Sequence, residues 1–160
     1  MAAQHNTTVI ESVTLTNTLD AYNAGDVIGG LITIPARPGV LRNIKLVDDD
    51  NEGAALTLTL FDAQPTTVAD DAVLDSNLVV ADLSKILRRL TLATADYLTI
   101  NSNKVGWFAN ASGGIDHAID YATVNNNIYA YLTCDATPTL AALSYTLYFT
   151  FWQNVSTPAA

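Results

Sequence analysis

The stretch Leu143-Ser-Tyr-Thr-Leu-Tyr-Phe-Thr-Phe-Trp152 decides the fold of this chain. Large apolar side chains occupy every second position, and Ser, Thr, Tyr and Trp side chains occupy the positions between them. Because successive side chains of a β-strand point to opposite faces of a sheet, this alternation predicts a strand and not a helix. One face is apolar enough to be core, whereas the other is half polar. The side chains predicted to face the core are Leu143, Tyr145, Leu147, Phe149 and Phe151.

The same alternation recurs along the chain. In Ala54–Asp62 the leucines at 56, 58 and 60 are predicted to face the core, and the threonines between them to face outward. Turn residues separate the predicted strands, and Asp48–Gly53 reads as a hairpin tip. Short strands joined by regular turns predict one antiparallel β-sandwich of about eight strands, a number that also fits a jelly roll. The remaining predicted strands are Thr8–Thr16, Val27–Ile34, Gly39–Val47, Tyr97–Ile100, Lys104–Ala109 and Ile128–Cys134, with a possible short one at Leu90–Ala93.

One segment, about 82–90, has the pattern of a short helix. Asp82 is suited to cap it by accepting backbone N–H bonds, and basic residues in its last turn oppose the helix dipole favourably. We expect this helix to close one end of the sandwich. Its predicted apolar face consists of Leu83, Ile86, Leu87 and Leu90, with Lys85, Arg88 and Arg89 on the other side.

The length of 160 residues is that of a single domain. We expect an N-terminal arm over 1–8, the sandwich over 9–153 and a C-terminal tail over 154–160. Charged residues make up only 14% of the chain, against about 25% in a typical soluble domain. So weakly charged a surface predicts one that partners cover, although Thr and Asn side chains could also solvate it.

The net charge of −9 restricts the classes of partner. Seven scattered basic residues cannot form the Lys- and Arg-rich patch that phosphate binding needs, so we expect no nucleic-acid partner. Anionic membrane surfaces are disfavoured for the same reason, and no apolar run approaches the length of a membrane span, so we expect no membrane association.

Three features of the sequence are candidate sites for metal binding or catalysis. The acidic run Asp48–Gly53 resembles the start of a calcium loop, but the position that needs a bidentate acid is Thr59; weak calcium binding stays open as a minor alternative. His117 lies between two carboxylates, Asp116 and Asp120, without a serine, cysteine or second histidine at a spacing that completes a known site. Cys134 is predicted to be a small buried hydrophobe. We therefore predict a protein that is not an enzyme and needs no metal or cofactor.

Partner contacts are the remaining use for the distinctive residues. Tyr129, Tyr131 and Tyr148 are predicted to lie on faces opposite the core, where exposed aromatic rings favour protein interfaces or sugar binding. The arm is suited to add a strand to a neighbouring sheet, and the long connections Gln64–Ala81 and Asn110–Asn127 are suited to partner contacts. The predicted interface residues are His5, Thr8, Trp107, His117, Tyr129, Tyr131 and Tyr148.

A resemblance gives these surfaces a candidate role. The stretches Asp20-Ala-Tyr22-Asn-Ala-Gly25-Asp26-Val-Ile-Gly29-Gly30, Gly39-Val40-Leu41 and Leu58-Thr-Leu60-Phe61-Asp62-Ala-Gln-Pro65-Thr66 resemble, in order and spacing, a family of small virion proteins of tailed bacteriophages. The similarity runs from about Val9 to Trp152, and the family is that of capsid decoration, or cement, proteins.

The resemblance implies a β-sandwich or jelly-roll subunit that binds the outside of the shell built by the major capsid protein, as a homotrimer on the phage capsid surface. It supplies no catalytic residues. The alternatives are another virion component, such as a head-fibre base or a tail accessory protein, and a carbohydrate-binding module that uses exposed Tyr and Trp side chains.

Overall fold

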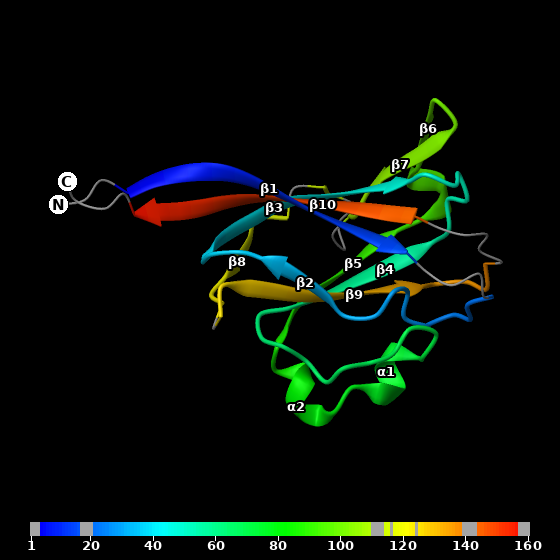
Figure 1. Cartoon of the computed structure of the whole chain (residues 1–160), viewed down its shortest axis with the longest axis horizontal. Helices are drawn as coiled ribbons and strands as arrows, with labels where there is room; N and C mark the ends of the chain where they lie inside the picture. The colour runs from blue at the N-terminus through cyan, green and yellow to red at the C-terminus, as the bar shows by residue number, and fades with distance from the viewer. Residues whose placement is uncertain are drawn as a thin grey trace.

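Two antiparallel sheets pack face to face as a β-sandwich in the computed structural model, as the sequence predicts (Figure 1). The structure describes residues 4–16, 21–109, 114–115, 117–123, 125–138 and 144–156. The six-stranded sheet contains, in order, β1 (Gln4–Thr16), β10 (Ser144–Ser156), β3 (Gly39–Asp48), β7 (Asn103–Trp107) and β6 (Leu98–Ile100), with β8 (Ile119–Tyr121) also paired to β3. The four-stranded sheet contains β2 (Ile32–Pro35), β9 (Asn127–Cys134), β4 (Leu56–Phe61) and β5 (Ile86–Leu92).

Most connections carry the chain from one sheet to the other. Strands β1 to β4 alternate between the sheets, and β9 and β10 do so again. The prediction of a hairpin at Asp48–Gly53 is therefore wrong, because β3 and β4 belong to different sheets. The Asp48 carboxylate instead fixes this crossing by accepting the N–H groups of Asp50 at 3.1 Å and Gly53 at 2.7 Å.

The core lies between the sheets and confirms the alternation of the last strand from Tyr145 to Phe151, whereas Leu143 lies outside the described residues. The inward side chains of β10 are fully buried, and those of β4 and β9 meet them from the four-stranded sheet. Cys134 is buried among them as predicted, and burial, followed by the charges of Asp26 and Asp135, raises the pKa of its thiol to about 12. The core residues of these three strands are Leu56, Leu58, Leu60, Ile128, Ala130, Leu132, Cys134, Tyr145, Leu147, Phe149 and Phe151.

A second apolar cluster covers the side of the four-stranded sheet that points away from the six-stranded sheet. The long connection from β4 to β5, which contains the one-turn helices α1 (Leu74–Asn77) and α2 (Val80–Leu83), lies across this face (Figure 1). A short 3-10 turn, η1 (Thr94–Asp96), follows β5. The buried members of this second cluster are Val27, Phe61, Val68, Leu74, Tyr129 and Tyr131.

The helix predicted over 82–90 is wrong. The helical turn α2 ends at Leu83, and Ile86–Leu92 forms strand β5 paired with β4. A β-bulge explains the error: Leu60 pairs with Arg88 and Phe61 with Ile86, so Leu87 is an extra residue. The bulge interrupts the period of two, and the apolar spacing that remains imitates a helix face.

Three other strand predictions need adjustment. The strand expected over 27–34 begins only at Ile32, because Gly29 and Gly30 adopt positive φ angles of 72° and 78°. Strand β8 was not predicted. Residues 4–6 of the predicted arm pair with 154–156 of the predicted tail, and Thr7 and Thr8 pair with Gln153 and Trp152, so both segments are the ends of β1 and β10. Strand addition to a neighbour would therefore use the outer edge of β1 or require this pairing to open.

Candidate interaction surfaces

The outward side of the six-stranded sheet is the larger of two surfaces suited to binding. We call it the outer face and define it by the outward side chains of β1, β10, β3 and β7. The strand pairing fixes which of these are neighbours: Ser12 lies opposite Tyr148, which lies opposite Lys45, which lies opposite Trp107. The outer face includes Thr8, Ile10, Ser12, Thr14, Arg42, Lys45, Trp107, Thr146, Tyr148, Thr150 and Trp152.

Two cation–π contacts organise this face. The Lys45 Nζ lies 4.4 Å from the centre of the Tyr148 ring, and the Arg42 guanidinium carbon lies 4.3 Å from that of Trp152. Such contacts at exposed sites contribute about 0.5–1 kcal/mol each. They hold two long cationic side chains flat on aromatic rings, so the face is preorganised and loses less side-chain entropy when a partner binds.

A bulge aims Arg42 at the Trp152 ring. Asn43 pairs with Thr150 and Leu41 with Phe151, which leaves Arg42 as the extra residue of β3. Bulges are known to redirect side chains in this way. The carbonyl oxygen of Arg42 accepts the backbone N–H of His117 at 2.9 Å, so the bulge also anchors the segment before β8.

The outer face carries exposed apolar area near its β1 edge. Ile10 is 63% exposed and Trp152 46% exposed. Because Ile10 lies opposite Thr150 and Thr8 lies opposite Trp152, Ile10 is a diagonal neighbour of both Trp152 and Tyr148. Ile10, Tyr148 and Trp152 therefore form a strip of diagonal neighbours. A strip of this kind suggests a binding surface, because single exposed apolar residues are common on soluble proteins but adjacent ones are not.

Three of the predicted interface residues lie on the outer face: Thr8, Tyr148 and Trp107. Sequence reasoning missed Ile10, Arg42 and Trp152 as members of this surface. The alternation of β10 already placed Trp152 outward, so it could have been found. Arg42 could not, because the bulge that positions it leaves no mark in the pattern.

Tyr129 and Tyr131 lie on the side of their sheet opposite the core, as predicted, but their predicted exposure is wrong, because both side chains are buried in the second cluster. The Tyr131 hydroxyl accepts the N–H of Val68 at 2.8 Å and donates to the carbonyl oxygen of Thr66 at 2.9 Å. Burial raises the pKa of Tyr131. Its ring meets Phe61 edge to face, with centroids 6.0 Å apart. Tyr131 therefore fixes the long connection onto the sheet and cannot stack on an external ligand.

The two histidines of the predicted set have different surroundings. The backbone of His5 pairs with Val155 at the end of β1, and its side chain lies outside the described residues. The His117 side chain is buried beside β8 within the single chain, and Asp120 is exposed. Asp116 lies outside the described residues, so the arrangement of a histidine with two carboxylates stays a prediction.

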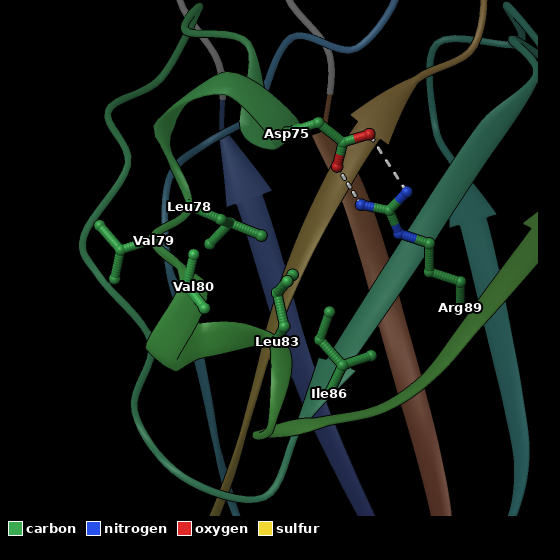
Figure 2. A pocket seen from close by; sticks show the side chains of 7 residues that line it. All are labelled: Asp75, Leu78, Val79, Val80, Leu83, Ile86 and Arg89. Carbon is green, nitrogen blue, oxygen red and sulfur yellow. Dashed lines mark hydrogen bonds and ion pairs between the residues drawn. The ribbon is translucent and has the colours of Figure 1, made fainter.

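The second surface is a pocket of about 500 Å³ between the helical turns and β5. Figure 2 shows aliphatic side chains from α2 and from the segment before it facing Ile86 of β5 across this pocket. An ion pair between Arg89 and Asp75 closes one side, and Arg89 Nε also donates to the Thr59 hydroxyl at 3.2 Å. We call this surface the α1–α2 pocket, lined by Asp75, Leu78, Val79, Val80, Leu83, Ile86 and Arg89.

The Asp82 carboxylate holds the wall of this pocket in place. It is buried and accepts the N–H groups of Val79 and Thr66, each at 3.1 Å, and the Lys85 ammonium at 2.9 Å. Burial alone would raise the pKa of Asp82, but the hydrogen bonds from Lys85, Thr66 and Val79 outweigh it and hold that pKa well below the usual range. Asp82 thus joins α2, the long connection and the start of β5.

Within the described residues, no group of three or more His, Cys, Asp or Glu side chains is placed to hold a metal ion. No helix among these residues is long and apolar enough to span a membrane. No protein-family model matches the chain, and no curated protein sequence matches it significantly. The two surfaces therefore carry the functional interpretation.

Proposed function

We propose that this protein is a structural virion protein that decorates a phage capsid, binding the outside of the major capsid shell as a homo-oligomer, in line with the trimer that the sequence resemblance implies. The observation that carries the proposal is the outer face. It presents Ile10, Tyr148 and Trp152 as a strip, with Arg42 and Lys45 fixed on the rings. Aromatic and Arg side chains of this kind dominate the binding energy of protein interfaces.

The strand order supports the same proposal. We infer that the sandwich is a jelly roll, because β1-β10-β3-β7 faces β2-β9-β4-β5 and most connections between consecutive strands cross from one sheet to the other. Jelly rolls recur in viral capsid domains and in lectins. A fold by itself does not fix a function, so this order favours the virion class without excluding sugar binding.

The mechanism requires no chemistry. A protein that binds the assembled shell, but not its dissociated subunits, shifts the assembly equilibrium toward the shell by mass action. A broad, preorganised and weakly charged face is suited to this role. It binds an extended lattice surface and needs no closed cavity.

The test is co-sedimentation with shells assembled from a major capsid protein of the genome that encodes this chain. We expect saturable binding, and we expect Trp152→Ala to weaken it about 30-fold, equivalent to the ~2 kcal/mol of an interface hot spot. Thr33→Ala is the matched control, because Thr33 is an exposed strand residue of the other sheet. Shells that bind the wild-type chain no better than Trp152→Ala would contradict the proposal.

Sugar binding is the second candidate, favoured by the exposed Trp152 ring on an open sheet face. Wild type and Trp152→Ala together distinguish capsid decoration from sugar binding. Binding to a defined glycan on an array, lost in Trp152→Ala while shells are not bound, would support the carbohydrate-binding module instead.

A further inference from the structure

The second edge of β1 is the longest unpaired sheet edge among the described residues. Strand β1 ends the order of the six-stranded sheet, and its thirteen residues pair with β10 on one side only. The backbone N–H and C=O groups that point to the other edge therefore have no strand partner in the described part of the chain. Groups of this kind are a template for pairing with another extended chain.

The other three sheet edges carry features that oppose strand addition. Strand β6 has only three residues, and β2 has four and ends at Pro35. Strand β5 contains the bulge at Leu87 and presents the exposed side chains of Arg88 and Arg89. Short strands, proline, bulges and charges are means by which natural sheets avoid edge-to-edge pairing. In contrast, β1 pairs with β10 in one continuous register, and Glu11 is its only Asp, Glu, Lys or Arg residue.

The sequence of β1 is suited to pairing with a second copy of itself. Two copies can form one antiparallel ladder about a two-fold axis that is normal to the sheet. Such an axis keeps both outer faces on the same side, so it passes through a residue and not between two residues. Ile10 is the central residue of β1, so an axis at Ile10 gives the longest overlap. Ile10 is also the most exposed large apolar side chain on the described strands, at 63%.

An axis at Ile10 gives compatible neighbours in the other positions. Thr8 of one copy lies opposite Ser12 of the other, and Val9 lies opposite Glu11. The two Glu11 carboxylates are then offset by two residues. An axis through Glu11 itself would place these carboxylates directly opposite each other, which is destabilising. The one charged residue of the strand therefore favours the same register as the length of the overlap.

We propose that β1 is a dimerisation edge: β1 of one copy pairs antiparallel with β1 of a second copy, with Ile10 on the two-fold axis. The two six-stranded sheets then form one continuous sheet. Because Ile10 is a diagonal neighbour of Tyr148 and Trp152 in its own copy, the strips of the two outer faces meet at the axis. The contact does not rest on the proposed function, and it is distinct from any three-fold contact that closes a trimer.

The size of the contact is that of a weak dimer. At about 3.4 Å per residue, thirteen paired residues extend over about 44 Å, and a sheet layer about 10 Å thick then buries about 900 Å² in total. This area is close to the ~1,000 Å² at which specific interfaces begin, and the meeting strips add to it. Two copies that each carry −9 repel one another, so added salt should strengthen the dimer by screening this repulsion.

Engineered cysteines test both the pairing and its register. Residues directly opposite in an antiparallel ladder have Cα atoms about 4.5–5.5 Å apart, a separation that a disulfide spans. Ile10→Cys alone should therefore form a disulfide-linked dimer under mild oxidation. Thr8→Cys or Ser12→Cys alone should not, because the two identical positions lie about 14 Å apart along the ladder, but an equimolar mixture of the two should. The native Cys134 is fully buried and should not compete.

Val80→Cys is the matched control, because Val80 is 85% exposed and belongs to α2, outside both sheets. At equal protein concentration Ile10→Cys should link at least about tenfold faster than this control, because pairing raises the effective concentration of the thiols. Sedimentation equilibrium provides a measurement without cysteines. At high protein and salt concentration, wild type should form more dimer than Ile10→Lys, which places two positive charges opposite each other at the axis.

Equal linking rates for Ile10→Cys and Val80→Cys would overturn the proposed pairing. A mixture of Thr8→Cys and Ser12→Cys that links no faster than either variant alone would overturn the register, and with it the proposal. The same mixture provides the test if Ile10→Cys fails to unfold cooperatively. All of these measurements are made without shells, so a failure of the decoration proposal leaves their outcome unchanged.

Discussion

At the scale of single residues, aromatic side chains have two roles that the sequence pattern does not distinguish: some form an exposed surface, and others hold a loop against the sheet. Tyr148 and Trp152 lie on the open outer face, each under a cation, whereas Tyr131 lies under the long connection. All three occupy outward positions of their strands. Which sheet face remains open depends on where a distant loop packs, and strand alternation carries no information about that.

Tyr131→Phe tests the structural task. It removes the hydroxyl that bonds Val68 and Thr66, and it leaves a buried N–H and a carbonyl group without this partner. We expect a loss of about 1–3 kcal/mol in the free energy of unfolding, measured by urea denaturation. Tyr148→Phe is the matched control and should change stability by no more than about 0.5 kcal/mol. Equal effects of the two substitutions would contradict this division of tasks.

At the scale of elements, most strands could be predicted and the segment around α2 could not. Strands β4, β9 and β10 alternate cleanly, and the predicted positions of these strands and of β3 agree with the structure to within a few residues. In β5 the bulge at Leu87 breaks the alternation, and Asp82 was read as the cap of a helix that does not form. The Asp82 carboxylate instead binds Thr66 and Lys85, and these contacts depend on how the long connection packs, which the sequence pattern does not predict.

Acid should loosen this element. Because the folded-state pKa of Asp82 lies below its ordinary value of 3.8, its contribution to stability is present above that pH and is lost as the pH falls further. We expect the amide protons of Thr66 and Val79 to exchange faster as the pH is lowered from about 4 to 2, after correction for intrinsic exchange. In Asp82→Asn these amides should be less protected at pH 7 and nearly insensitive to that pH step. An unchanged pH dependence in this variant would assign the effect to other carboxylates.

At the scale of the whole molecule, composition and alternation predicted a two-sheet sandwich, and the structure confirms it. The order of the strands in each sheet could not be predicted from the sequence, because the strands of a sandwich can be connected in many ways. The candidate surfaces were partly predictable. Thr8, Trp107 and Tyr148 lie where alternation placed them, whereas the α1–α2 pocket depends on how one long connection packs against the sheet.

The pairing of β1 with β10 along their whole length brings Gln4 opposite Ser156. The two ends of the described residues therefore lie side by side, and joining them would allow the chain to be opened at an exposed turn instead. A circular permutant that joins the original ends through a short flexible linker and opens the chain between Asn101 and Ser102 should keep the sandwich, with its melting temperature within a few degrees of wild type. Calorimetry would measure this melting temperature, and a permutant that fails to unfold cooperatively would contradict the expectation.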